Sequence, residues 1–197
     1  MNRAYSAAVT LSKKPIRPTY SPSGQRGWRG CERRWHAASV PRLVLPTSLV
    51  RDSFLAGMRA LSEEEGSSTD WLDQAAGDFG ALVASRYGTR RLWNVPATEL
   101  WYVDGPAYIG TVMVRHELTP QLRHEGGNIG YHVVPGYRRR GHATAMLAEA
   151  RAWCRARGMT RLLVTCDTGN VASRRVIEAN GGVLDNDSGG ICRYWIG

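Results

Sequence analysis

The stretch that decides the fold is Ile129-Gly-Tyr-His-Val-Val134, followed directly by Pro135-Gly-Tyr-Arg-Arg-Arg-Gly-His-Ala143. The first part is an apolar run that predicts a strand. After the turn, apolar residues recur at the spacing of a helix face; they are Ala143, Met146, Leu147, Ala150, Trp153 and Cys154. A strand, a glycine-containing turn and a helix therefore follow one another without interruption.

This turn has the composition of an anion-binding site. The first N–H groups of a helix have no partner inside the helix, and the helix dipole adds positive potential at the same place. Gly141 has no side chain to block a ligand. Arg138, Arg139 and Arg140 add permanent positive charge. The sequence predicts a site for a phosphorylated ligand, and the alternative for the three arginines is a solvated basic turn.

The same residues resemble a known family. Arg138-x-x-Gly141-x-Ala143 matches the R/Q-x-x-G-x-G/A signature of the GNAT superfamily of acyl-CoA-dependent N-acetyltransferases. A second apolar strand, residues 162–166, precedes Asn170-x-x-Ser173, which opens a short helix ending at Asn180-Gly181-Gly182. This resembles the second half-motif of the family. The resemblance covers about residues 43–197, and it extends to a subgroup of predicted acetyltransferases with a Gly-Gly-x-Ile-Gly-Tyr strand and an Arg-Tyr-Trp-Ile C-terminus.

The resemblance implies an α/β (α+β) fold, with a GNAT-like mixed central sheet and helices on both faces. It also implies acetyl-CoA as the acyl donor, with its pyrophosphate on the turn and its pantetheine arm paired to the strand before it. The expected cofactor-binding residues are Tyr131, His132, Val133, Arg138, Arg139, Arg140, Gly141, His142, Ala143, Thr144, Asn170 and Ser173. For Asn170, a plain helix N-cap is the alternative.

The reaction implied by the resemblance is direct attack of a neutral amine on the thioester, with a small-molecule or protein amine as acceptor. A backbone N–H on the central strand, assigned to Val133, would stabilise the oxyanion. Two positions depart from the family pattern. Ile177 stands where many members have a Tyr general acid, and Thr165 stands where some have a Glu base. These departures motivate a second hypothesis, a non-catalytic acyl-CoA sensor.

Replacement catalytic groups are few. Glu125 and His124 precede the central strand, His116 ends the neighbouring strand, and Tyr131 could orient water or protonate the leaving group. A surface or packing role is the alternative for each of them. The histidines lie on separate segments without paired ligand spacing, so the sequence predicts no metal site.

Charge divides the chain into two parts. Residues 1–43 hold nine Lys or Arg against one acid, Glu32, and so carry most of the net charge of +9. Residues 1–42 are predicted to be a flexible basic N-terminal extension, because prolines and glycines interrupt them and apolar periodicity is absent. Residues 43–197 are predicted to be the acetyltransferase domain. The extension could bind nucleic acid, but a disordered tail or a start codon placed too early explains it as well.

The remaining expectations concern location and secondary structure. The chain shows no apolar run that would span a membrane and no secretory leader, so we expect a cytoplasmic protein. A homodimer is one expectation, since many relatives are dimers. Helices are predicted over 49–66 and 70–88, a hairpin over 99–115, a polar connection over 115–125, and closing strands over 183–185 and 191–196.

Overall fold

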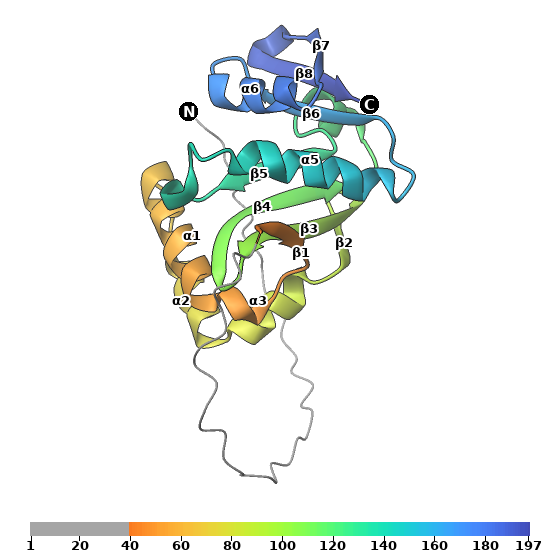
Figure 1. Cartoon of the computed structure of the whole chain (residues 1–197). Coiled ribbons are helices and arrows are strands. Elements are labelled where there is room, and N and C mark those ends of the chain that lie inside the picture. The colour runs from red at the N-terminus through yellow and green to blue at the C-terminus, as the bar shows by residue number, and fades with distance from the viewer. Residues whose placement is uncertain (1–39) are drawn as a thin grey trace, which may run out of the picture. The chain divides into compact units, whose positions relative to one another are not determined.

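The structure of the protein is a computed structural model that describes residues 40–197 (Figure 1). The basic extension therefore lies almost entirely outside the described residues, although Arg42 already belongs to the first strand. The helices and strands are β1 (Arg42–Val44), α1 (Arg51–Glu65), α2 (Asp70–Gly77), α3 (Phe79–Arg86), β2 (Thr89–Leu92), β3 (Val95–Asp104), β4 (Ala107–Arg115), α4 (Pro120–His124), β5 (Ile129–Val133), α5 (His142–Arg155), β6 (Leu162–Asp167), α6 (Val171–Ala179), β7 (Val183–Asn186) and β8 (Ile191–Ile196).

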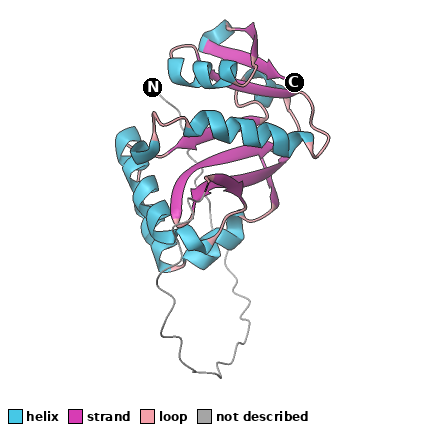
Figure 2. Ribbon diagram, in the orientation of Figure 1, coloured by secondary structure: helices cyan, strands magenta, loops and turns pink. Residues whose placement is uncertain are grey.

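Within the described residues the strands form one mixed sheet in the order β1-β3-β4-β5-β6-β8-β7, and β2 also pairs with β3. The pair β5–β6 is parallel, while the other paired strands are antiparallel. Helices pack on both faces of this sheet (Figures 1 and 2). The predicted fold class is therefore confirmed.

The central strands read as almost continuous apolar runs because both of their faces are covered. Along β3, Leu100 and Tyr102 belong to a core that includes α5. Trp101 and Val103 alternate with them and join the core formed by α1, α2 and α3, in which Phe54 stacks on Trp101 at 4.6 Å between ring centroids. Side-chain alternation on one strand thus connects the two helical layers.

The prediction of one continuous helix over residues 70–88 was wrong. It breaks at Asp78, whose backbone is non-helical and whose side chain accepts a hydrogen bond from the Ala81 N–H. Asp78 therefore serves as the N-cap of α3, and Gly77 ends α2. The Gly-Asp pair is a recognisable stop-and-start signal that the apolar periodicity outweighed.

The connection predicted over 115–125 contains α4, which has Thr119 as its N-cap and Pro120 in its first turn. Strand β2 was not predicted, and β3 begins at Val95 rather than at residue 99. The hairpin turn after Asp104 and the closing pair β7–β8 agree with expectation. The helix predicted over 49–66 is present as α1, with Gly66 at φ 65° as its left-handed C-cap.

Strands β5 and β6 are joined at one place only. Their pairing is limited to Ile129 opposite Val164. Immediately before it, the buried Asn128 side chain accepts from the Leu163 N–H at 2.9 Å and donates to the Arg115 C=O at 3.0 Å. A Cβ on Gly127 would lie 2.4 Å from the Leu163 oxygen, so glycine is required for this close approach. This contact fixes the point from which the two strands diverge.

Replacing Asn128 should destabilise the whole fold. Asn128→Ala removes a donor and an acceptor from a buried position, so we expect the free energy of unfolding to fall by about 2–4 kcal/mol. Urea denaturation measures this loss. The matched control is Asn170→Ala, which removes an exposed N-cap and should cost about 1 kcal/mol. Equal losses in the two variants would contradict the role given to Asn128.

Candidate functional site

The side of β5 that faces away from β4 forms the first part of the site. The Val134 N–H donates to the Ile109 C=O at 3.0 Å, so residue 134 points its backbone groups toward β4. Backbone groups alternate in direction along a strand, and His132 therefore also points toward β4, whereas Tyr131 and Val133 point the other way. Because β6 pairs only at Ile129, these last two residues have no strand partner there. We call this side of residues 130–133 the open edge.

The second part of the site is the turn between β5 and α5. Helix α5 begins after Gly141, which has φ 81° and no side-chain cap. Its first backbone bond runs from the Ala145 N–H to the Gly141 C=O at 3.1 Å. The N–H groups of residues 142–144 consequently precede the hydrogen-bond ladder of the helix, and this is the geometry that binds anions.

The turn also contains a strained residue. Arg139 has φ 62°, a left-handed conformation that costs an L-residue with a Cβ roughly 1–2 kcal/mol. Residues held in such conformations concentrate at ligand-binding sites, where the surrounding structure maintains them. Arg139 is exposed, as are Arg138 and Arg140. Arg140 lies over the Tyr137 ring at 5.6 Å from its centroid.

Arg138, the first residue of the family signature, is engaged with the protein itself. Its Nη1 contacts both carboxylate oxygens of Glu64 at 2.7 and 2.8 Å, and its Nε donates to the Val133 C=O at 3.0 Å. The guanidinium group thus connects the C-terminal end of α1 to the end of β5. The other two arginines remain the more available positive charges beside the turn.

Tyr131 and Ser173, two of the predicted cofactor-binding residues, contact each other. Their hydroxyl groups are 2.8 Å apart and connect β5 to α6. Burial raises the pKa of Tyr131 to about 12, although its hydrogen bond to Ser173 opposes the rise. The Asn170 side chain accepts from the Ser173 N–H at 3.0 Å and is the N-cap of α6. Three predicted residues therefore form one cluster beside the open edge.

Two candidate bases lie apart from the open edge. His116 lies on the β3 side of β4, where its Nε2 is 2.9 Å from the Thr98 Oγ1 and its ring packs edge-on against Trp153. Burial, followed by the charge of Arg157, lowers the pKa of His116. Glu125 is exposed and follows α4, before the point where β5 and β6 join.

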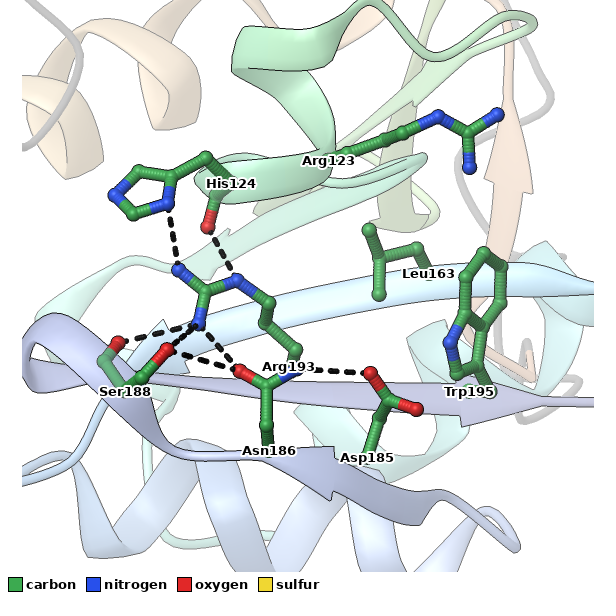
Figure 3. Close-up of a pocket in the computed structure, with 8 residues that line it drawn as sticks. All are labelled: Arg123, His124, Leu163, Asp185, Asn186, Ser188, Arg193 and Trp195. Atoms are coloured by element: carbon green, nitrogen blue, oxygen red, sulfur yellow. Dashed lines mark hydrogen bonds between the residues drawn. The ribbon is translucent and has the colours of Figure 1, made fainter.

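His124 belongs to a separate polar pocket of about 450 Å³ (Figure 3). The pocket is organised by Arg193, which donates to the His124 C=O at 2.8 Å, to its Nδ1 at 2.9 Å and to Asn186 Oδ1 at 2.6 Å. Further bonds join Arg193 to the backbone and hydroxyl oxygens of Ser188. Arg193 therefore holds the β7–β8 loop against α4, a role that no local sequence pattern indicates.

The positions at which many family members carry catalytic side chains are structural in this chain. Ile177 is fully buried in the core. The Thr165 hydroxyl accepts from the Gly126 N–H at 2.8 Å and fixes the loop before β5. Neither residue can donate or accept a proton as a carboxylate or a phenol would.

His132 was expected to contribute through its backbone, but its side chain is the more informative group. Residue 132 is partly exposed, and its Nε2 lies 3.1 Å from the Tyr108 Oη. Burial lowers the pKa of His132 to about 4, so the ring is neutral at pH 7. Strand alternation was the available signal, because it places residue 132 on the face opposite to Tyr131.

The comparisons with known proteins agree with this architecture. The family model for the acetyltransferase (GNAT) domain matches residues 43–183. The chain therefore belongs to the GNAT family, whose members transfer acetyl groups. No match was found among curated proteins.

Solved structures show the same fold. The GNAT domain of S. lividans PAT has a TM-score of 0.54 and 17% identity over 79% of this chain and 89% of that one. A putative GnaT-family acetyltransferase from Bordetella pertussis has a TM-score of 0.54 and 16% identity over 84% and 100%. The microcin C7 self-immunity acetyltransferase MccE, solved with acetyl-CoA and AMP, has a TM-score of 0.50 and 12% identity over 78% and 89%.

Between residues 40 and 197, no helix is long and apolar enough to cross a membrane. In the same part of the chain, no three His, Cys, Asp or Glu side chains are grouped so that they could hold a metal ion.

Strain at Arg139 can be separated from its charge. In Arg139→Gly the left-handed conformation becomes unstrained, so we expect the free energy of unfolding to stay unchanged or rise by up to about 1 kcal/mol. Arg155→Gly, in the last turn of α5, should instead lose about 1 kcal/mol. Thermal or urea unfolding compares them, and a clear loss of stability in Arg139→Gly would show that its side chain stabilises the turn.

Proposed function

We propose that the protein transfers the acetyl group of acetyl-CoA to a primary amine of a small molecule or protein, by direct attack of the amine on the thioester. One observation carries this proposal: the open edge of β5 leads directly into the strained turn and the N-terminus of α5. A ligand with an anionic head and an amide-containing arm fits these two consecutive features. The likeness in fold to MccE, which was solved with acetyl-CoA and AMP, supports the same choice.

The backbone supplies the binding groups. The N–H groups of residues 142–144 face the pyrophosphate, and Arg139 and Arg140 add charge beside it. The amide groups of the pantetheine arm pair with the open edge as an additional strand would. Tyr131, Ser173 and Asn170 border this arm. Acetyl-CoA thus binds mainly through main-chain groups, so few specific side chains are needed for its binding.

The chemistry requires a donor to the oxyanion and an acceptor for the proton of the amine. The N–H groups of Val133 and Tyr131 both point along the open edge, and either can donate to the thioester oxygen as charge develops there. The leaving thiolate needs little protonation, because a thiol has an ordinary pKa near 8.5. An acid at the position of Ile177 is therefore dispensable, whereas a proton acceptor is not.

The alternative function is an acyl-CoA sensor without turnover, and Ile177 and Thr165 are the observations that favour it. Both hypotheses require acetyl-CoA binding, and only the enzyme releases free CoA when an amine is added. A thiol-reactive dye that detects CoA separates them across a panel of small amines and amino-terminal peptides. Release above the amine-free rate supports the transferase, and its absence across the panel supports the sensor.

Gly141→Asp should abolish acetyl-CoA binding, because it places negative charge where the pyrophosphate is expected. We expect at least a hundredfold weaker affinity, about 2.7 kcal/mol, in calorimetric titration of the full chain. Gly158→Asp is a closely matched control at the other end of α5. Gly141 and Gly158 have φ values of 81° and 80°, and an added Cβ would meet nothing within 4 Å at either position.

The two variants therefore carry the same backbone strain and the same charge. Weaker binding by Gly141→Asp alone supports the turn as the cofactor site. Equal binding by the two variants, or no binding by the unmodified chain, would refute the proposal.

A further inference from the structure

His132 lies beside the position where the thioester is expected. It is paired directly with Thr111 of β4, and its neighbours Tyr131 and Val133 present their N–H groups along the open edge. Adjacent Cα atoms are about 3.8 Å apart, so a carbonyl bonded to either N–H lies next to residue 132. The imidazole projects from the face of the sheet that α1 covers, together with Tyr108 and Thr111.

A bulge in β4 brings Tyr108 to this ring. Tyr102 pairs with Gly110 and Val103 pairs with Tyr108, so Ile109 is the extra residue. Without the bulge, residues 108 and 111 would point to opposite faces; with it, the Tyr108 Oη lies 2.7 Å from the Thr111 Oγ1. The same oxygen lies 3.1 Å from the His132 Nε2.

These contacts allow a tautomer of His132 in which Nδ1 is free to accept a proton. Burial raises the pKa of Tyr108 above its ordinary value, so the phenol keeps its proton. If Tyr108 donates this proton to Thr111, its oxygen accepts from an Nε2–H of His132. The Nδ1 then carries a lone pair, and among residues 40–197 it has no hydrogen-bond partner. Residue 132 is partly exposed, and its Nδ1 is not among the fully buried side-chain atoms of residues 40–197 that lack a partner, so a second substrate can reach this atom.

The charges around the ring keep it in the form that accepts a proton. Burial dominates, the Glu99 carboxylate on β3 opposes it, and the guanidinium groups of Arg86 and Arg138 reinforce it. Glu99 is itself paired with Arg86 at 3.0 Å and with Arg90 at 2.8 Å. The imidazole is consequently neutral over the ordinary working range of pH, while Glu99 is close enough to stabilise a transient positive charge.

We propose that the His132 side chain is the catalytic proton acceptor of the acetyl transfer, held in place by Tyr108. This inference rests on the proposed function. The amine lone pair forms the new C–N bond while the carbonyl π pair moves to oxygen, which accepts from the open-edge N–H. One amine proton passes to Nδ1. The oxyanion then re-forms the C=O, the C–S bond breaks with its electron pair on sulfur, and the imidazolium returns its proton to the thiolate or to water.

This assignment fills the role that the other candidates do not. His116 faces β3, Glu125 precedes the junction of β5 and β6, and the Tyr131 phenol is bonded to Ser173. His132 combines three properties among the described residues: it is adjacent to the open edge, it has an unpaired ring nitrogen, and it is neutral.

The first test compares two histidine variants of the full chain. His132→Gln and His116→Gln each replace a partly buried ring whose Nε2 contacts a hydroxyl, but only the first lies beside the open edge. CoA release from acetyl-CoA is followed with hydroxylamine as a small probe amine. We expect kcat to fall by about a hundredfold in His132→Gln, with a much smaller change in His116→Gln. Affinity for acetyl-CoA, measured by calorimetry, should be retained in both.

The second test is chemical rescue. His132→Ala removes the ring, and added imidazole should restore a concentration-dependent part of the hydroxylamine rate. The same addition should not raise the rate of His116→Ala. A merely structural histidine would not show this dependence, because no proton passes to its ring during turnover.

The outcomes distinguish the proposed acetyl transfer from the role of His132 in it. Failure of the unmodified chain to bind acetyl-CoA would overturn the proposed function and this inference together. Binding of acetyl-CoA without any CoA release would favour the sensor, and would likewise overturn both. Equal losses in the two Gln variants, or no imidazole rescue, would overturn only the role of His132. A selective loss with retained affinity, followed by rescue, would establish it.

Discussion

The site depends on the single junction between β5 and β6. The Asn128 side chain and the close approach of Gly127 hold the two strands together at Leu163, and beyond Ile129 they part. Backbone N–H and C=O groups are seldom left without partners inside a protein, so an unpaired stretch of central strand is normally costly. Here that stretch is retained, and it supplies the main-chain groups that a strand-like ligand can use.

The backbone groups and the side chains of β5 have different roles in the site. Its edge away from β4 carries the N–H groups of Tyr131 and Val133, while its α1 face carries the His132 ring. Because alternation along a strand is strict, neighbouring residues can serve binding and proton transfer without competing for space. Arg138 then joins the end of this strand to Glu64 on α1, so the helix that covers the ring is fixed to the strand that bears it.

Local signals explain what the sequence could predict. The apolar run, the turn with Gly141 and the periodicity of α5 are contiguous, and together they defined both the turn and the fold class. Local signals also existed for the two missed features: Asp78 is a standard N-cap, and Thr119 before Pro120 starts α4. In both places a longer apolar pattern or a polar composition was given more weight than a single capping residue.

Other features depend on contacts that no local pattern contains. Arg138 was assigned to the ligand from the family signature, and its contact with Glu64, 74 residues earlier in the chain, is not part of that local pattern. The bulge at Ile109 becomes visible only when the registers of β3 and β4 are compared, and without it Tyr108 would not meet His132. Likewise, the hold of Arg193 on the β7–β8 loop requires α4 to be folded beside it.

A histidine kept neutral by burial makes the native state sensitive to mild acid. The unfolded chain takes up a proton at His132 near pH 6.5, whereas the folded chain does so only near pH 4. Between these values the unfolded state binds more protons, so the free energy of unfolding declines as pH falls, by at most about 3 kcal/mol from this group. Above pH 6.5 both states are neutral at this residue and the penalty disappears. The same burial that would keep a proton acceptor ready at neutral pH therefore lowers the stability of the domain in mild acid.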